Sequence, residues 1–330
     1  MTVSKKDDVQ VNKTGRPVRR IVSCILFPVI CIVLLISMSG LFQPKYYFAA
    51  ELKSPETEMW ENFYDLPKNS LTTVFVGDSN VYCGVDAARF NSITGESSFD
   101  LAVSSGCFME GYYMLREVLR YQKPETVVLD MNSVNRDYSK NVVISKRPFQ
   151  DMKWSKVKWD ALTDDNRGLG KKDILMRMFT VFEYHDRWKT LSEVDFHPDW
   201  YKTNVLGYAP SNDIAEGIAH DRFYNEEDLE YDEIASYYFD KIVSLCEEND
   251  MKLILIKVPK IDWNVSYMEL AEGLAEEYGL DYIDYNADKD YNRIGIDDEN
   301  DWRDAAHLNV HGAKKFTDVL ADDLSDIING

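Results

Sequence analysis

The sequence predicts an α/β domain built on a flavodoxin-like, doubly wound parallel sheet of five strands. Two observations lead to this prediction: short apolar runs alternate with segments of helical spacing, and turn residues bound each run. Apolar strands of this kind are buried on both faces of a sheet that helices cover on each side. The expected strands are Thr72–Gly77, Ser98–Val103, Thr126–Met131, Lys252–Val258 and Leu280–Asp284.

Amphipathic helices are expected between and after these strands. The segment Phe108–Tyr121 places apolar residues three and four positions apart, as do Tyr231–Glu248 and Tyr267–Tyr278. A last helix is expected over Val310–Ile328, and Asn309 before it is a suitable N-cap.

Residues 132 to about 229 interrupt this alternation and are predicted to form an insertion or cap. The segment is rich in charged and aromatic side chains, among them Trp154, Trp159, Trp188 and Trp200. These rings could form a sugar-stacking surface, or they could form the small core of a cap subdomain. The second interpretation is favoured because aromatic side chains are usually buried.

An uncharged segment near the N-terminus is long enough to cross a membrane. Residues 21–42 would span about 33 Å as a helix. Residues 1–20 are basic, so the positive-inside rule leaves them in the cytoplasm as a short tail and places everything after residue 42 outside. A cleaved signal peptide is the alternative, because Ser37–Ser39 has a small-x-small pattern. Residues 43–70 are expected to link this anchor to a domain over residues 71–330.

The charge distribution argues against nucleic acid as a partner. The net charge is −20, and the first twenty residues contribute +4, which leaves −24 for the remainder. A surface that acidic repels the phosphates of nucleic acids and also an anionic lipid surface.

The cysteines do not form a disulfide framework. Cys83, Cys107 and Cys246 lie outside the apolar segment, and three cysteines cannot all pair within one chain. A bridge between Cys83 and Cys107 is conceivable because each follows a predicted strand end. Three small core residues are an equally good interpretation.

Ser79 is a candidate nucleophile. It follows a predicted strand in the run VFVGDSN, and ligands of such sheets bind at the carboxyl ends of the strands. A serine hydroxyl needs a base and a group that orients the base. Of the five histidines, His307 alone has an acidic residue three positions earlier, namely Asp304. Both lie in the loop before the last helix, which reaches the same edge of the sheet.

The motifs GDSN and DAAH, in this order and at this edge, resemble those of the SGNH/GDSL hydrolase superfamily. The resemblance extends from about Leu71 to the C-terminus, apart from the insertion, and implies the SGNH hydrolase fold. It implies that Ser79 is the nucleophile, His307 the base and Asp304 the acid that orients it. No metal or organic cofactor would be required.

The resemblance also implies an oxyanion hole with three donors. The first is the backbone N–H of Ser79, and Asn132 after the third strand is the candidate for the side-chain donor. For the backbone donor after the second strand the candidate is Ala102, although residues 104–106 are open as well. The sequence departs from the family pattern here, because Asn132 lacks the usual flanking glycine and aspartate.

A metal site at the last helix is not expected. His307 and His311 are four positions apart, as helical metal ligands can be, but the intervening residues lack the glutamate of zinc proteases. An N-cap at Asn309 would also leave His307 outside the helix.

An anchored, extracytoplasmic domain of this family resembles enzymes that add or remove acyl esters on cell-envelope polymers. The resemblance therefore implies a serine esterase or O-acyltransferase at the cell membrane, with an acylated polysaccharide or a related polymer as substrate. A membrane acyl-donor protein as partner would favour transfer. The alternatives are a lipid esterase and a catalytically inactive subunit for polysaccharide binding or assembly.

Overall fold

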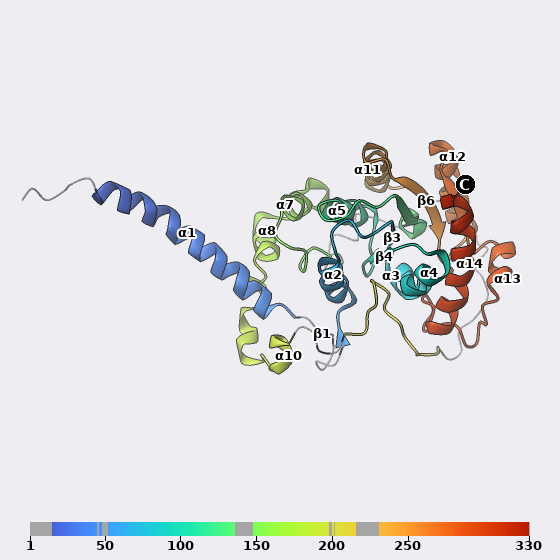
Figure 1. The fold of residues 1–330 in the computed structure, drawn as a ribbon, viewed down its shortest axis with the longest axis horizontal. Helices are drawn as coiled ribbons and strands as arrows, with labels where there is room; N and C mark the ends of the chain where they lie inside the picture. The colour runs from blue at the N-terminus through green and yellow to red at the C-terminus, as the bar shows by residue number, and fades with distance from the viewer. Residues whose placement is uncertain are drawn as a thin grey trace, which may run out of the picture.

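The computed structural model shows an α/β domain from which one long helix projects (Figure 1). It describes residues 15–44, 46–47, 52–135, 148–197, 200, 202–215 and 231–329. Parts of the predicted insertion, including residues 136–147 and 216–230, therefore lie outside the described residues.

A five-stranded parallel sheet forms the centre of the domain, which confirms the predicted fold class. In spatial order its strands are β4 (Ser98–Ala102), β3 (Thr73–Gly77), β5 (Thr126–Asp130), β6 (Lys252–Lys257) and β7 (Asp281–Asp284). Counted along the chain from β3, this order is 2-1-3-4-5, the flavodoxin-like order. Its topological switch point lies between β3 and β5, so the loops after these two strands border the expected binding crevice.

Helices cover both faces of the sheet, and each face has its own apolar cluster. On one face lie α5 (Phe108–Val118), α11 (Glu233–Glu248) and α12 (Val265–Tyr278). On the other lie α4 (Ala87–Thr94) and α14 (Val310–Asn329). Four of these five helices were expected from their apolar spacing; the short α4 was not.

Residues 43–70 are more than the linker that the sequence predicted. They contain β1 (Tyr46–Tyr47), β2 (Leu52–Lys53) and α2 (Pro55–Asp65). Trp60 and Phe63 of α2 are buried in the same cluster as α5 and α11. The apolar pattern did not predict this helix, because its buried face includes the acidic residues Glu56 and Glu58. Both accept backbone hydrogen bonds there.

The described part of the insertion consists of short helices. These are η1 (Met131–Asn135), α7 (Lys156–Thr163), η2 (Asp165–Arg167), α8 (Lys171–Met178), α9 (Val181–Tyr184), η3 (His185–Lys189) and α10 (Glu193–Phe196). Phe149, Met152, Leu162 and Met178 join the cluster that α5 shares. All four tryptophans of the insertion are exposed, so the interpretation of these rings as the core of a cap is wrong.

The projecting helix is α1 (Gly15–Phe42). Its part Val22–Phe42 is long and apolar enough to cross a membrane, and most of that stretch is exposed. The last turns of α1 contact α9, η3 and α10 of the insertion.

Candidate active site

The structure brings Ser79, His307 and Asp304 together at the carboxyl edge of the sheet. His307 Nε2 lies 2.7 Å from Ser79 Oγ, and His307 Nδ1 lies 2.8 Å from Asp304 Oδ1. Ser79 and His307 are both partly exposed, so a substrate can reach them. A hydroxyl, an imidazole and a carboxylate joined in this order have the geometry that activates a serine.

The sharp turn at Ser79 explains the glycine and aspartate before it. β3 ends at Gly77, and α3 (Ser79–Gly84) begins with Ser79 itself, where the sequence analysis expected only a turn. Asp78 caps this helix, because its Oδ1 accepts the Asn80 N–H at 2.9 Å. A Cβ at position 77 would lie 2.5 Å from Val81 Cγ2, so only glycine fits there.

Asp304 organises the loop that carries the imidazole. Its Oδ1 accepts hydrogen bonds from the backbone N–H groups of Ala306 (2.9 Å) and His307 (3.0 Å). Partial burial opposes ionisation of Asp304, but the bonds from the imidazole and from Ala306 outweigh it and lower the pKa to about 2. The carboxylate is therefore charged at neutral pH and able to stabilise an imidazolium.

The helix after this loop begins where the sequence predicted. Asn309 Oδ1 accepts the N–H groups of His311 (2.9 Å) and Gly312 (3.2 Å), as an N-cap does. His307 thus lies before the helix, and His311 lies in its first turn. Within the described ranges, no group of three or more histidines, cysteines and carboxylates could hold a metal ion.

A buried polar network lies beneath the nucleophile and contains Asn132. Asp78 accepts hydrogen bonds from Asn80 Nδ2 at 2.8 Å and from Asn132 Nδ2 at 2.6 Å. Asn132 follows β5 and is almost fully buried. Its amide is thus fixed by the residue next to Ser79 in the chain. Because an amide nitrogen carries two hydrogens, one donor of Asn132 remains for another acceptor.

The network continues through Asp130 to Lys257, a pair that the sequence analysis missed. Asp130 accepts the N–H groups of Asn132 (3.2 Å) and Val258 (2.9 Å) and lies 3.4 Å from Lys257 Nζ. Both side chains are completely buried. Burial raises the pKa of Asp130 and lowers that of Lys257, and each charge opposes the shift of the other. The signal in the sequence was the second lysine of the apolar run KLILIKV, which stands between Ile256 and Val258.

Ala102 does not turn its backbone N–H toward the nucleophile. It is the last residue of β4. The N–H of Val103, which follows it, bonds to β3, and the Asp100 N–H bonds to Leu206 O on the opposite side. N–H groups alternate in direction along a strand, so that of Ala102 points the same way as that of Asp100, away from β3. The expectation that the Ala102 N–H is an oxyanion donor is therefore corrected, because the register of the sheet turns this N–H away.

The turn after β4 leaves Ser105 as the candidate for this donor, because the N–H groups of Ser104 and Gly106 bond to Glu56 and to Val103 O. A hydrogen bond of 3.0 Å closes the turn of residues 103–106, and Ser105 has the left-handed φ of 54° that its third position requires. Glu56 of α2 holds this turn by accepting the Ser104 N–H at 3.0 Å. The turn lies close to the site, because a Cβ on Gly106 would be 2.9 Å from the last carbonyl oxygen of β3.

No disulfide joins Cys83 to Cys107 in the structure. Cys83 lies on α3 and is buried, which raises the pKa of its thiol to about 12. Cys246 is buried as well, with its pKa raised to about 12. These two side chains are core residues, as one of the two interpretations expected.

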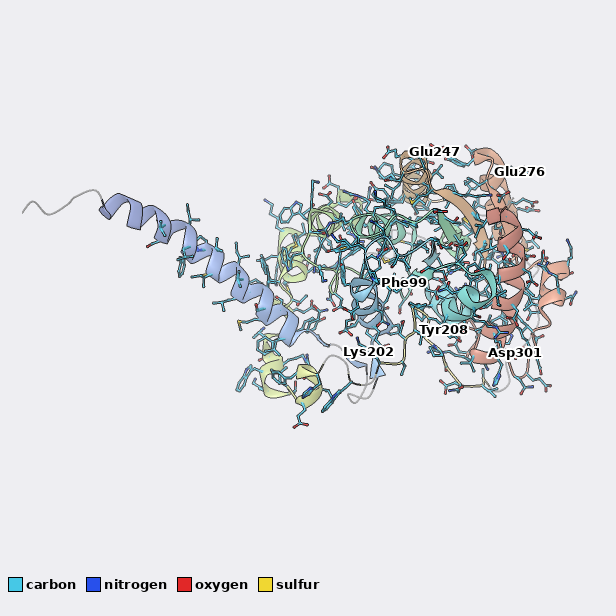
Figure 2. The ribbon with its side chains drawn as sticks, viewed as in Figure 1. Phe99, Lys202, Tyr208, Glu247, Glu276 and Asp301 are labelled. Carbon is cyan, nitrogen blue, oxygen red and sulfur yellow. The ribbon has the colours of Figure 1, made fainter. Side chains whose placement is uncertain are left out.

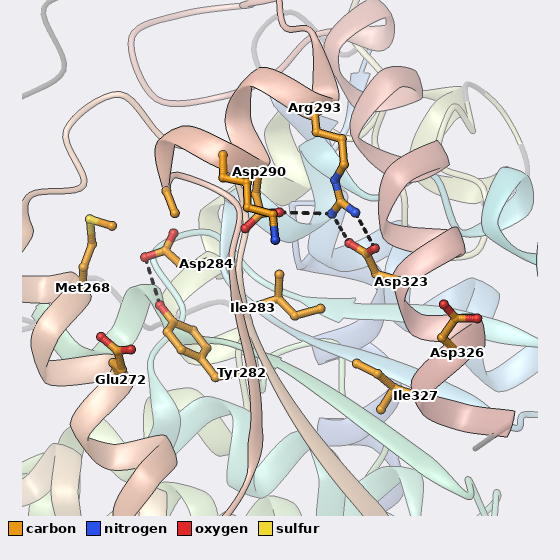
Figure 3. Close-up of a pocket in the computed structure, with 12 residues that line it drawn as sticks. Met268, Glu272, Tyr282, Ile283, Asp284, Asp290, Arg293, Asp323, Asp326 and Ile327 are labelled. Atoms are coloured by element: carbon orange, nitrogen blue, oxygen red, sulfur yellow. Dashed lines mark hydrogen bonds and ion pairs between the residues drawn. The ribbon is translucent and has the colours of Figure 1, made fainter.

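A cavity of about 500 Å³ lies away from Ser79, beside the edge strand β7 (Figure 3). Residues of β7, α12, α13 (Asp288–Ile294) and α14 line it. Arg293 lies between Asp290 and Asp323 in this cavity and forms ion pairs with both. Two strands separate β7 from β3, so the cavity is not part of the serine site.

Comparison with known proteins assigns the chain to no family. No family model matches it, and no curated protein matches it. Among solved structures, the chain is similar to a putative acylhydrolase from Bacteroides fragilis NCTC 9343, with a TM-score of 0.41 and 14% sequence identity. The match covers 86% of this chain and 98% of that chain. A likeness this weak supports no conclusion about activity.

Proposed function

We propose that the protein is a serine esterase or O-acyltransferase of the SGNH type. The observation that carries this proposal is the 2.7 Å contact between Ser79 Oγ and His307 Nε2, with Asp304 on the other side of the imidazole. Ser79 Oγ attacks the ester carbonyl while its proton passes to His307 Nε2. The imidazolium, which Asp304 stabilises, then gives that proton to the departing alcohol and leaves an acyl-serine.

The fate of the acyl-serine decides between the two activities. If water attacks it, the acid is released and the protein is an esterase. If the hydroxyl of a second sugar attacks it, the acyl group is transferred. In both cases His307 accepts the proton of the attacking group and returns it to Ser79 Oγ.

Three donors are proposed for the oxyanion hole. The N–H of Ser79 is at the start of α3, where helical N–H groups have no partner within the helix. The N–H of Ser105 replaces that of Ala102, and the remaining hydrogen of Asn132 Nδ2 is the third donor. Loss of one such donor costs roughly 100- to 1,000-fold in rate.

We further propose that α1 is retained as a single-pass anchor, with its N-terminus in the cytoplasm. Ser39, the last residue of the small-x-small pattern, is buried, and its hydroxyl accepts the Val181 N–H at 3.2 Å. Its carbonyl accepts Thr180 Oγ1, also at 3.2 Å. Cleavage after Ser39 would break these contacts. On intact cells, an N-terminal tag should resist external protease and a C-terminal tag should be digested; the reverse would refute the orientation.

The proposed substrate class is an acyl ester of a cell-envelope polysaccharide or a related polymer. It is supported by the resemblance of the two motifs and by the proposed placement of the domain outside the membrane. A membrane acyl-donor protein is the proposed partner if the reaction is a transfer.

The first test is covalent labelling of the purified full-length chain with a fluorophosphonate, which reacts with activated serines. We expect the wild type and the control Ser92→Ala, which alters an exposed serine on α4, to be labelled. Ser79→Ala should not be labelled. A folded wild-type protein that stays unlabelled would refute the proposal and favour a binding or assembly role.

The second step asks which ester is cleaved. Acylated envelope polysaccharides and phospholipid vesicles are offered to the protein separately, and released acid is measured. Release from the polymer alone supports the proposed substrate class. Release from phospholipid alone would identify a lipid esterase instead.

A further inference from the structure

Large apolar side chains gather on the exposed surface of the insertion. Outside α1, eleven large apolar residues are exposed in the described part of the chain, and seven of them lie between residues 154 and 200. Three of these seven, Phe182 (43%), Trp188 (64%) and Phe196 (59%), make up the aromatic face. An exposed group of aromatic side chains of this kind marks a surface that contacts something outside the chain.

The aromatic face is fixed to the end of the apolar helix. Its three residues belong to α9, η3 and α10, and each of these helices contacts α1. Arg187 of η3 donates a hydrogen bond of 2.8 Å to the carbonyl of Phe42, the last residue of α1. Figure 1 shows α10 next to the end of α1 that meets the domain.

The length of the apolar helix determines the depth of this face. The 21 residues Val22–Phe42 span about 31 Å as a helix, close to the thickness of about 30 Å of a bilayer's hydrocarbon core. When this stretch crosses a membrane, Phe42 lies at the outer boundary of the hydrocarbon. The side chains attached to that end of α1 then lie at the level of the lipid headgroups. Aromatic rings are enriched at this level in membrane proteins.

The distribution of charge agrees with this placement. Residues 148–197 contain nine Lys and Arg and nine Asp and Glu, whereas residues 231–329 contain nine and twenty-four. Figure 2 shows Glu247, Glu276 and Asp301 on the side of the domain away from α1. The acidity of the chain, which repels an anionic lipid surface, is thus concentrated far from the membrane end of α1.

We propose that the aromatic face lies in the headgroup region of the phospholipid bilayer that α1 crosses. The domain is then held at the membrane by two contacts, the spanning helix and this face, and α1 does not act as a flexible tether. The occupant of the face is lipid and not a second protein, because the face is continuous with a helix that, as the proposed anchor, is itself surrounded by lipid. This inference does not depend on the reaction at Ser79.

The test uses the full-length chain in nanodiscs of phosphatidylcholine and phosphatidylglycerol. Cys24, Cys31 and Cys107 are replaced by serine or alanine. Cys83 and Cys246 stay, because burial raises the pKa of each thiol to about 12 and keeps it unreactive.

A fluorophore is then attached at Trp188→Cys on the aromatic face or, as matched control, at Tyr237→Cys. Tyr237 is an exposed aromatic residue of α11, which does not belong to the insertion. Lipids that carry a nitroxide near the headgroup replace part of the phosphatidylcholine, and the loss of fluorescence is measured. We expect about twofold quenching or more at position 188 and none at position 237.

Phe196→Cys provides a second position on the aromatic face if Trp188→Cys does not fold. Equal fluorescence with and without the nitroxide lipid at both positions of the face would overturn the proposal. Quenching at position 237 as strong as at 188 would also overturn it, because the contact would not be specific to this face. Protection from an aqueous quencher in native membranes, but not in nanodiscs, would identify a protein partner instead.

Discussion

The α/β domain and the insertion place the same type of residue in opposite surroundings. In the domain, Trp60 is 1% exposed and stabilises the core, where burial of a large apolar side chain contributes about 1.5–3 kcal/mol. In the insertion, Trp188 is 64% exposed and contributes little to folding. The domain therefore buries its aromatic residues beneath the Ser79 site, and the insertion, as proposed, uses its exposed ones for an external contact. This division predicts that chemistry at the Ser79 site does not depend on the exposed aromatic residues of the insertion.

The largest effect should come from Asp304, which we propose orients the base. Asp304→Asn removes the charge that stabilises the imidazolium, and we expect the hydrolysis rate of a soluble aryl ester to fall about 10⁴-fold. Trp188→Ser, on the aromatic face, should keep the wild-type rate with the same soluble ester. A comparable loss in both variants, measured as kcat on folded protein, would contradict the division between the two regions.

The next effect concerns two ion pairs, one in each region. Lys257→Met leaves Asp130 buried without its partner, which should cost about 3–5 kcal/mol of stability. Lys156→Met removes a lysine whose side chain is 82% exposed and which pairs with Asp160 in α7, so we expect about 0–1 kcal/mol. Thermal unfolding of both variants in nanodiscs checks the difference. Equal melting temperatures would show that the buried pair does not support the domain.

The strands and the grouping of Ser79, His307 and Asp304 could be predicted because their signals are local. Each strand is a short apolar run ended by turn residues, and its observed bounds differ from the predicted ones by one residue at most. Ser79 follows a strand and His307 precedes the last helix, and this was enough to predict that both lie at one edge of the sheet. The catalytic roles of these residues stay predictions until the labelling is done.

The remaining features depend on contacts that no local pattern encodes. The register of β4 against β3 decides where the Ala102 N–H points, and the sequence does not carry that register. The partner of Lys257 comes from another strand, 127 positions away. Likewise, burial of aromatic residues is the usual outcome, so nothing in the sequence marked Trp188 as an exception. The contact of Ser39 near the end of α1 with the start of α9 could not be predicted from the sequence either.

The smallest expected effect concerns two carboxylates, Asp100 and Asp160, whose contributions to stability should change with pH in opposite directions. Asp100 in β4 is completely buried, neither of its oxygens has a hydrogen-bond partner among the described residues, and burial raises its pKa well above the ordinary value. Burial opposes ionisation of Asp160 in α7 as well, but the hydrogen bonds from Lys156 and Arg116 outweigh it and lower that pKa. A raised pKa gives stability that is fully present below the unfolded-state pKa of about 4 and is lost as the pH rises above it.

Asp100→Asn removes this loss, so its melting temperature should exceed that of the wild type increasingly between about pH 4 and pH 7. The gain should grow until the pH passes the raised pKa of Asp100, because the buried carboxylate of the wild type is increasingly forced to ionise over this range. Asp160→Asn should show the opposite sign, because a lowered pKa gives stability that appears as the pH rises through the same range. Parallel pH profiles for the two variants would mean that the buried carboxyl of the domain is not held in its neutral form.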